Sequence, residues 1–235
     1  MPNWCQNVLK VAGSEDKIKE FKREARFQTE QEIRALKLHE PSEWQKKGKS
    51  TTELIKMEQR NIAAWLKQPF TFYKLVPQPP ESERDYNSEE GKTCEGGWDW
   101  YTWNCDHWGT KWDVSDCKIE QQNKNELTYR FNTAWSPPED GIEEVSSKFP
   151  ELSFLLIYFE AGMGFMGKSF FENGSRNELL VIEDFYDSDL VQIIRDEDLA
   201  EDEGIEIEEA PIIELESEDP EIEDIIESYG FGLWS

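Results

Sequence analysis

The chain has 235 residues, of which 37% are hydrophobic, 13% aromatic and 32% charged, with a formal net charge of -26. The aromatic content excludes a wholly disordered chain, and the length suits one main domain with appendages. Because no stretch approaches the roughly 20 apolar residues of a membrane-spanning helix, and the N-terminus does not resemble a secretory signal, we expect a cytoplasmic protein that does not contact membranes.

The first predicted elements are a strand and a helix. Polar and apolar residues alternate over residues 7–11, and Gly13 ends the strand. Ser14 is a suitable N-cap, and the apolar residues that follow recur with helical spacing to residue 25. Residues 27–69 stay polar and helix-permissive, so we predict a helical insertion there.

The middle of the chain is rich in aromatic residues. Residues 70–77 are apolar and predict a strand, which the prolines at its end would terminate. The segment 94–113 is rich in tryptophan, with a spacing that fits neither a helix nor a strand. Residues 116–121 and 126–133 predict a hairpin, because the Asn-Lys-Asn between them favours a turn.

The next elements complete a sheet. We predict a helix over residues 137–149, with Ser136 as its N-cap and Pro137 at its first position, where the missing N–H of proline is not needed. Residues 152–159 are apolar on both faces, as in a central strand, and residues 165–172 return after a glycine turn. Residues 179–182 are a further candidate strand. This order of elements predicts an α+β protein.

Residues 184–235 are predicted to form an acidic C-terminal extension. Residues 196–227 contain seventeen Asp and Glu and no Lys or Arg. Such a segment repels nucleic acid and attracts basic surfaces. Within it, Ile222, Ile225, Ile226 and Tyr229 have helical spacing, which predicts a short helix over residues 220–229.

Several short motifs carry a family resemblance. Met1-Pro-Asn-Trp-Cys5, Trp108-Gly-Thr-Lys-Trp-Asp113 and Thr133-Ala-Trp-Ser-Pro-Pro138 resemble, in this order, the YubB ferredoxin-like family of phage and plasmid proteins. Tyr158-Phe-Glu-Ala-Gly162 and Gly164-Phe-Met-Gly167 are similar to it as well, so the resemblance covers about residues 1–172. It implies a ferredoxin-like antiparallel sheet with helices on one face, here assigned to residues 1–183. It implies no agreed activity and no functional residues.

Gly162-Met-Gly-Phe-Met-Gly167 matches the G-x-G-x-x-G pattern of dinucleotide-binding proteins. That fingerprint has to open a helix whose N-terminus faces the pyrophosphate. Residues 168–172 instead have the pattern of a returning strand. We therefore predict a glycine-rich hairpin.

Cys94, Cys105, His107 and Cys117 are soft ligands that zinc accepts, but they include no C-x-x-C pair, so we assign no metal and no cofactor. On a strand, Cys105 and His107 would share a face as nucleophile and base. No oxyanion donor or orienting acid accompanies them. We assign no catalytic residue; the sequence favours a protein that is not an enzyme without deciding the question.

The candidate ligand-binding residues are Trp100, Trp103, Trp108 and Lys111. Aromatic rings interleaved with a cation stack on the bases of single-stranded nucleic acids and nucleotides. The alternative is that the tryptophans form the layer over the sheet and replace a scarce aliphatic core. The sequence favours the core interpretation and leaves both open.

The acidic extension supports the first functional hypothesis, a noncatalytic mobile-element protein that binds a host protein as a counter-defence factor or DNA mimic. Its carboxylates would imitate DNA phosphates in a basic groove, and the simpler interpretation is a solvated, solubilising segment. The candidate partner-binding residues are Glu206, Glu208, Glu209, Glu214, Glu216, Glu218, Asp219 and Glu221. The alternative function is a domain that binds single-stranded nucleic acid or a nucleotide through the tryptophans, with the extension competing for its basic surface.

Overall fold

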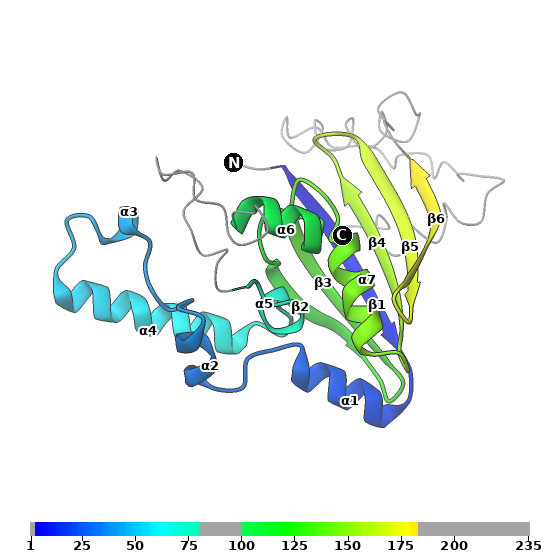
Figure 1. Cartoon of the computed structure of the whole chain (residues 1–235), viewed down its shortest axis with the longest axis horizontal. Helices are drawn as coiled ribbons and strands as arrows, with labels where there is room; N and C mark the ends of the chain where they lie inside the picture. Colours follow the sequence, from blue (N-terminus) through cyan, green and yellow to red (C-terminus); the bar gives the residue numbers. More distant parts are fainter. Residues whose placement is uncertain (1–2, 80–99, 183–235) are drawn as a thin grey trace, which may run out of the picture.

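The structure, a computed structural model, describes residues 3–79 and 100–182 (Figure 1). Its centre is a six-stranded antiparallel sheet with the order β2-β3-β1-β4-β5-β6. The strands are β1 (Trp4–Ala12), β2 (Ser115–Gln122), β3 (Glu126–Ala134), β4 (Ser153–Glu160), β5 (Phe165–Glu172) and β6 (Ser175–Ile182). The acidic extension and its predicted helix at 220–229 lie outside the described residues.

The N-terminal strand β1 lies inside the sheet, between β3 and β4. Leu9, for example, is opposite Tyr129 of β3 and Leu156 of β4. The order β2-β3-β1-β4, with helical crossovers before β2 and before β4, is the split β-α-β arrangement of ferredoxin-like folds. Strands β5 and β6 extend the sheet beyond β4. The predicted α+β class, antiparallel sheet and strand hairpin are confirmed.

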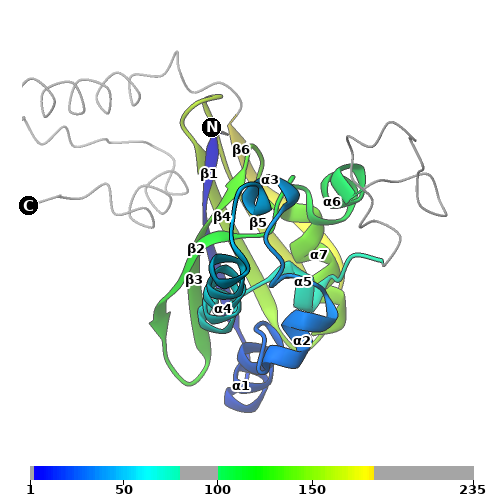
Figure 2. The same cartoon turned by 90° about the vertical axis from the view of Figure 1, so that its left-hand side faces the viewer.

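The described helices lie on one side of the sheet or beside it (Figures 1 and 2). They are α1 (Glu15–Glu24), α2 (Glu30–Ala35), α3 (Glu43–Lys46), α4 (Thr51–Lys67), α5 (Phe72–Leu75), α6 (Trp100–Trp108) and α7 (Glu139–Lys148). Phe21 of α1 shows how the layers meet, because its ring lies 5.5 Å from that of Phe154 on β4 and 5.1 Å from that of Phe149 after α7. None of these helices is long and apolar enough to cross a membrane.

Residues 27–69 contain α2, α3 and α4. Each of the three helices begins with a capping box, in which the N-cap side chain and the third helical residue satisfy each other's backbone N–H groups. Phe27, Ile33 and Ile62 form a small buried cluster that is separate from the main core. These helices therefore pack largely on one another, beside the sheet.

Residues 70–77 contain the short helix α5 in place of the predicted strand. The Thr71 hydroxyl accepts a hydrogen bond from the backbone N–H of Tyr73 at 3.2 Å and donates one to the Asp113 carboxylate. Asp113 also accepts from the backbone N–H of Phe72 at 2.8 Å. These bonds satisfy the donors at the start of a helix, so the prediction of an extended segment was wrong.

Helix α7 starts at Glu139, two residues after the predicted first position at Pro137. The Ser136 hydroxyl does not cap the helix; it donates to the carbonyl of Gly109 at 2.5 Å. This tertiary hydrogen bond fixes the connection between β3 and α7 against the loop that follows α6.

Asp113 gives the fold a predicted pH dependence. Burial raises the pKa of Asp113 to about 6, although hydrogen bonds from Thr71 and three backbone N–H groups oppose the shift. The pKa of Asp113 in the folded protein is above its usual value of 3.8, so the folded protein binds this proton more tightly than the unfolded chain does. Protonation of Asp113 therefore stabilises the fold, and this stabilisation is lost as the pH rises through about 6. We expect the free energy of unfolding of the wild type, relative to Asp113→Asn, to fall between about pH 4 and pH 6. Urea denaturation along a pH series measures this difference, and a constant difference would contradict the prediction.

The second face of the sheet carries no described helix. Strand alternation places Val8 there, opposite Arg130 on one side and Ile157 on the other. Val8 and Ile157 are each only 1% exposed and form a cluster of their own. We call this surface the open face, and define it by Val8, Lys10, Lys118, Arg130, Leu155, Ile157, Met166 and Lys168.

Candidate functional site

Aromatic rings surround one lysine at the end of the sheet where β1 begins and β3 ends. The Lys111 ammonium lies 4.6 Å from the ring centroid of Trp135, 4.9 Å from that of Trp112 and 5.3 Å from that of Tyr101, all within the range of cation–π attraction. Trp4 joins the group through Trp112, at 6.4 Å between centroids. We call Trp4, Tyr101, Lys111, Trp112 and Trp135 the aromatic–lysine surface.

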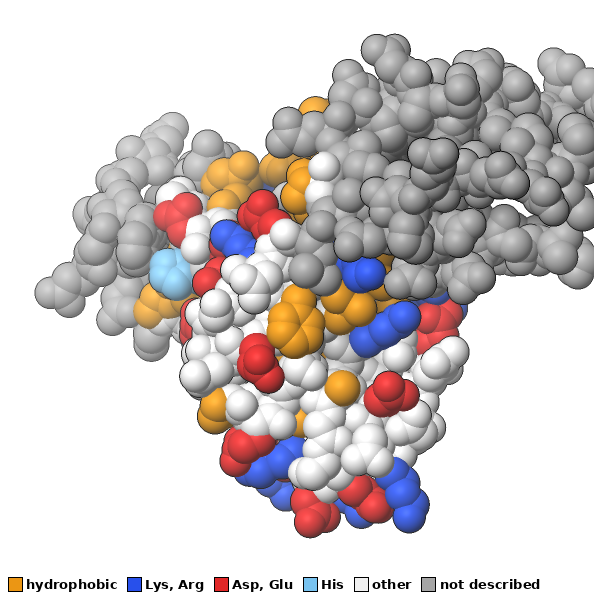
Figure 3. Space-filling view, turned by 90° about the vertical axis from the view of Figure 1, so that its right-hand side faces the viewer, with side chains coloured by type: hydrophobic (Ala, Val, Ile, Leu, Met, Phe, Trp, Pro, Cys, Tyr) orange, Lys and Arg blue, Asp and Glu red, His pale blue; other side chains and the backbone are white. Residues whose placement is uncertain are grey.

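The tryptophans of this surface are accessible. Trp4, Trp112 and Trp135 are 39%, 39% and 41% exposed, whereas most large apolar side chains of the domain are buried. Figure 3 shows one side of the molecule. On that side the larger groups of exposed hydrophobic side chains lie toward the upper end, and charged side chains of both signs lie at the lower end. Contiguous exposed aromatic side chains mark binding sites more often than chance, so this is the strongest candidate site among the described residues.

The backbone at Trp135 is strained. Its φ of 73° is in the left-handed region, which costs a bulky residue about 1–3 kcal/mol. Tertiary hydrogen bonds hold it: the Trp135 N–H donates to the carbonyl of Asn3 at 3.0 Å, and the Thr133 hydroxyl donates to the carbonyl of Ser136 at 2.7 Å. Thr133 in turn accepts from the buried side-chain amide of Asn7 at 2.9 Å. A buried polar network therefore positions an exposed ring.

The loop after α6 positions Lys111 and Trp112. Gly109 makes the turn with a φ of 74°, and the Thr110 hydroxyl donates to the carbonyl of Ala134 at 2.9 Å. The buried side chain of Asn104 donates to the Lys111 carbonyl at 2.8 Å. The loop is thus tied to β3 on one side and to α6 on the other, so the cation and the rings keep a fixed relation.

The structure separates the four predicted ligand-binding residues. Trp108 is fully buried and Trp103 is 6% exposed, and the Trp108 indole N–H donates to the carbonyl of Val76 at 2.8 Å. Both rings are core residues, as the core interpretation of the tryptophans proposed. Lys111 belongs to the aromatic–lysine surface. Trp100 is half-buried, and its ring centroid lies 5.9 Å from that of Tyr101.

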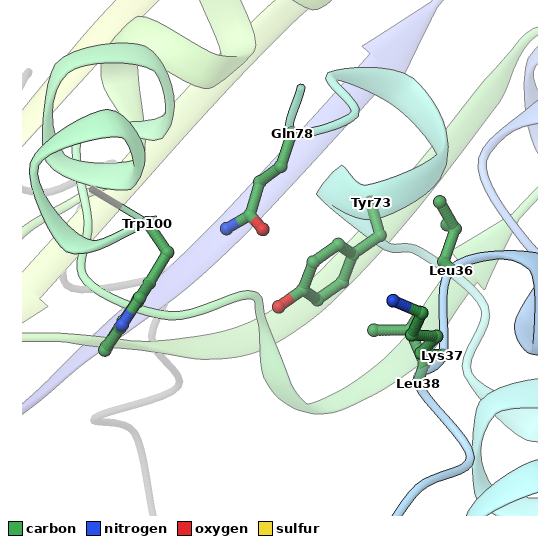
Figure 4. Close-up of a pocket in the computed structure, with 6 residues that line it drawn as sticks. All are labelled: Leu36, Lys37, Leu38, Tyr73, Gln78 and Trp100. Carbon is green, nitrogen blue, oxygen red and sulfur yellow. The ribbon is translucent and has the colours of Figure 1, made fainter. Parts of the chain in front are cut away.

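Trp100 also lines a small cavity. Its volume is about 270 Å³, and its walls are Leu36, Lys37, Leu38, Tyr73, Gln78 and Trp100 (Figure 4). The Gln78 side chain lies between the two aromatic rings in this view. The volume is at the lower limit for small-molecule sites, which usually measure about 300–1,000 Å³. The cavity therefore fits a fragment the size of one ring system better than a whole dinucleotide.

Sequence reasoning missed Trp4 and Trp135 as members of a surface site. Both residues lie within motifs that carry the family resemblance, but more than 100 positions separate them in the chain. Their shared location follows from the pairing of Trp4 with Ala134 in the β1–β3 register. One signal in the sequence could have indicated a surface site: both tryptophans lie near the ends of predicted strands, where side chains need not be buried.

The chemistry of the thiols fits no catalytic or metal role among the described residues. Cys105 and His107 lie on α6, where residues two apart do not share a face, and the His107 ring stacks on Trp103 at 4.3 Å. Burial raises the pKa of the Cys5 and Cys117 thiols, so neither supplies a reactive thiolate. Residues 3–79 and 100–182 contain no cluster of three His, Cys, Asp or Glu side chains that could hold a metal ion, and Cys94 lies outside them.

The glycine-rich motif is a hairpin, as predicted. Gly164 has a φ of 78° in the turn between β4 and β5, and Phe165 starts β5 directly afterwards. The buried Glu160 carboxylate accepts hydrogen bonds from the backbone N–H groups of Gly162 and Met163. These N–H groups are therefore already occupied, and no helix follows to bind a pyrophosphate.

A comparison with protein-family models agrees with the fold. Residues 111–206 match a family model described as "Ferredoxin-like domain in Api92-like protein". The domain is ferredoxin-like. The crystal structure of the protein Api92 from Yersinia pseudotuberculosis aligns with 78% of this chain and 98% of its own, at 12% identity and a TM-score of 0.49. No curated protein matches the chain. The matched family model extends past residue 183, the predicted end of the ferredoxin-like domain.

The predicted partner-binding carboxylates, from Glu206 to Glu221, lie outside the described residues. The geometry of the candidate site therefore comes from the aromatic–lysine surface, the neighbouring cavity and the open face.

Proposed function

We propose that this protein is a noncatalytic binding protein whose aromatic–lysine surface takes a single-stranded nucleic acid or nucleotide. The observation that carries the proposal is the position of Lys111 among three rings, two of which belong to exposed tryptophans. A base can stack on an exposed indole face while the adjacent ammonium meets a phosphate. The arrangement contains both features of a site that binds nucleotides without reading their sequence.

The charge distribution supports a short ligand. Lys111 is the cation of the aromatic–lysine surface, so stacking supplies most of the affinity and phosphate contacts supply less. Trp4 connects this surface to the open face, because Trp4 and Val8 point to the same side of β1. Lys10, Arg130 and Lys168 on that face would meet further phosphates of a longer strand.

Replacing Trp112 with alanine tests the proposal. We expect binding of a fluorescently labelled thymidine oligonucleotide to weaken by about 1–3 kcal/mol, which is the contribution of one stacked base. Fluorescence anisotropy measures the affinity. Trp44→Ala is the matched control, since Trp44 is 84% exposed on α3 and lies outside the surface. Equal affinity of the Trp112→Ala variant and the control would reject the proposal.

Lys111→Gln separates the cation from the rings. We expect weaker binding and a slope of the logarithm of affinity against the logarithm of salt concentration that is smaller by about 0.7, the value for one phosphate contact on a single strand. The Trp112→Ala variant should keep the wild-type slope. If Lys111→Gln leaves the salt dependence unchanged, the ammonium does not contact a phosphate.

A second candidate function is binding of a basic host protein by the acidic extension, in a mobile-element, counter-defence or DNA-mimic role. The seventeen acidic residues of the segment 196–227, with no cation among them, favour it. The resemblance to the YubB family of phage and plasmid proteins is a further reason, and it would place the protein in the host cytoplasm. This proposal concerns a different region from the aromatic–lysine surface, so the two are separable.

The second candidate is tested with a full-length variant whose eight predicted partner-binding carboxylates are replaced by amides. We expect the wild type to retain a DNA-binding host protein from lysate and to displace duplex DNA from it, and the amide variant to do neither. Elution with increasing salt measures the electrostatic part of the interaction. Retention of the same protein by both chains would contradict a role for these carboxylates.

A further inference from the structure

The open face has an apolar centre with basic residues on both sides. One row of residues crosses the sheet in register, with Lys118 and Arg130 on one side, Val8 and Ile157 in the centre and Lys168 on the other side. The centre is apolar and the flanks are basic. Glu120 pairs with Arg130 at 3.0 Å, and Glu126 and Glu172 lie on the same face of the sheet, so the four cations of the face outnumber these three carboxylates by one.

The apolar centre is covered although none of the described helices packs there. Val8 and Ile157 are 1% exposed, a value typical of a core, and Phe159 on the same face is 6% exposed. The described helices lie on the other side of the sheet (Figure 2). An apolar cluster at the centre of a sheet face needs a covering layer to be removed from water.

We propose that the acidic C-terminal extension of the same chain docks on the open face and competes there with the anionic ligand. The extension begins after Ile182 of β6, and Ile182 is opposite Met166 of the open face, so the chain leaves the sheet at the edge of this surface. The competition rests on the proposed function, whereas the docking does not.

The extension has the composition that the face requires. Its carboxylates complement the four cations of the face, and the isoleucines at 222, 225 and 226 supply an apolar stripe for its centre. Length is no obstacle, because six strands span about 24 Å and twenty extended residues reach about 66 Å. A segment of opposite charge and matching apolar pattern, attached at the edge, has a high effective concentration at this face.

Zero-length crosslinking of the intact chain with a carbodiimide tests the docking. We expect amide bonds from Lys10, Lys118 and Lys168 to carboxylates of residues 196–227, and few from Lys56, an exposed lysine on α4. The preference for crosslinks at these three lysines over Lys56 should decline at high salt, which screens the attraction between the lysines and the carboxylates. An even distribution over all exposed lysines would overturn the docking. Crosslinks between isotope-labelled and unlabelled chains would place the segment on a second copy and overturn docking within one chain.

Oligonucleotide binding tests the competition separately. At low salt we expect the full-length amide variant to bind the labelled thymidine oligonucleotide about tenfold more tightly than the wild type, which corresponds to about 1.4 kcal/mol. Equal affinities, with the crosslinks as expected, would overturn the competition and leave the docking. If neither chain binds the oligonucleotide, the proposed function fails, and the crosslinks alone decide the docking.

Discussion

Replacing Trp108 with alanine is expected to lower the free energy of unfolding by about 3–5 kcal/mol, the range for a large aromatic side chain in a core. The Trp108 ring is fully buried, and its centroid lies 5.8 Å from that of Phe72 and 5.1 Å from that of Tyr73. The substitution also removes the indole N–H that satisfies the buried carbonyl of Val76. Urea denaturation followed by far-ultraviolet circular dichroism measures the loss.

The same substitution distinguishes the two interpretations of the tryptophan-rich segment. If Trp108 served a ligand, its removal would change binding and leave stability within about 0.5 kcal/mol, as for an exposed residue. Trp44→Ala, on the exposed side of α3, should show that small effect. A Trp108→Ala variant as stable as Trp44→Ala would contradict the placement of this ring in the core.

Substitutions at Trp135 are expected to weaken oligonucleotide binding, and their effects on stability should report the backbone strain at this position. Both Trp135→Ala and Trp135→Gly should weaken oligonucleotide binding by about 1–3 kcal/mol, because each removes one stacking ring. Of the two variants, the glycine one should be the more stable by about 1 kcal/mol, since Trp135 has a φ of 73° and glycine alone adopts that conformation without strain.

This order of stability is the reverse of the usual one. At ordinary strand positions glycine is less stable than alanine, because it loses more conformational freedom on folding. Anisotropy and urea denaturation on the same two proteins provide both measurements. An alanine variant more stable than the glycine variant would show that the left-handed backbone at Trp135 relaxes once the ring is gone.

Local patterns in the sequence predict most of the sheet because the relevant interactions are short-range. The alternation in residues 7–11 and the apolar run 152–159 each indicate a strand, and the turn at Asn123-Lys124-Asn125 indicates a hairpin. All three features occur in the structure. The turn after β4 is also predictable, because Lys168 to Glu172 has a strand pattern where a dinucleotide site needs a helix.

Tertiary contacts decide the elements that the sequence does not predict. The aromatic run 70–77 suits a strand or a buried helix, and the hydrogen bonds that it donates to Asp113, more than 40 positions away, select the helix. In α6 the tryptophans lie on several faces, so no apolar stripe indicates a helix. The helix forms because Trp103 and Trp108 pack inward while Trp100 borders the cavity.

The candidate site is predictable only in part, for the same reason. Lys111 and the tryptophans near it are adjacent in the chain and stand out as a group. Trp4 and Trp135 reach that group only after β1 pairs with β3, and the strain at Trp135 depends on a hydrogen bond to Asn3. A surface assembled from segments that lie far apart in the chain has no local signature.

The position of β1 inside the sheet has a consequence for the order of events during synthesis. Its two neighbours, β3 and β4, begin at Glu126 and Ser153. More than 100 further residues are therefore synthesised after β1 before either of its edges can pair. Pairing at such sequence separations is slow, and an unpaired apolar strand is prone to aggregation. The helices of residues 30–67, with their own capping boxes and local core, are the part that can form during this delay. Nascent chains that stop before β3 should therefore carry helical structure and no paired β1.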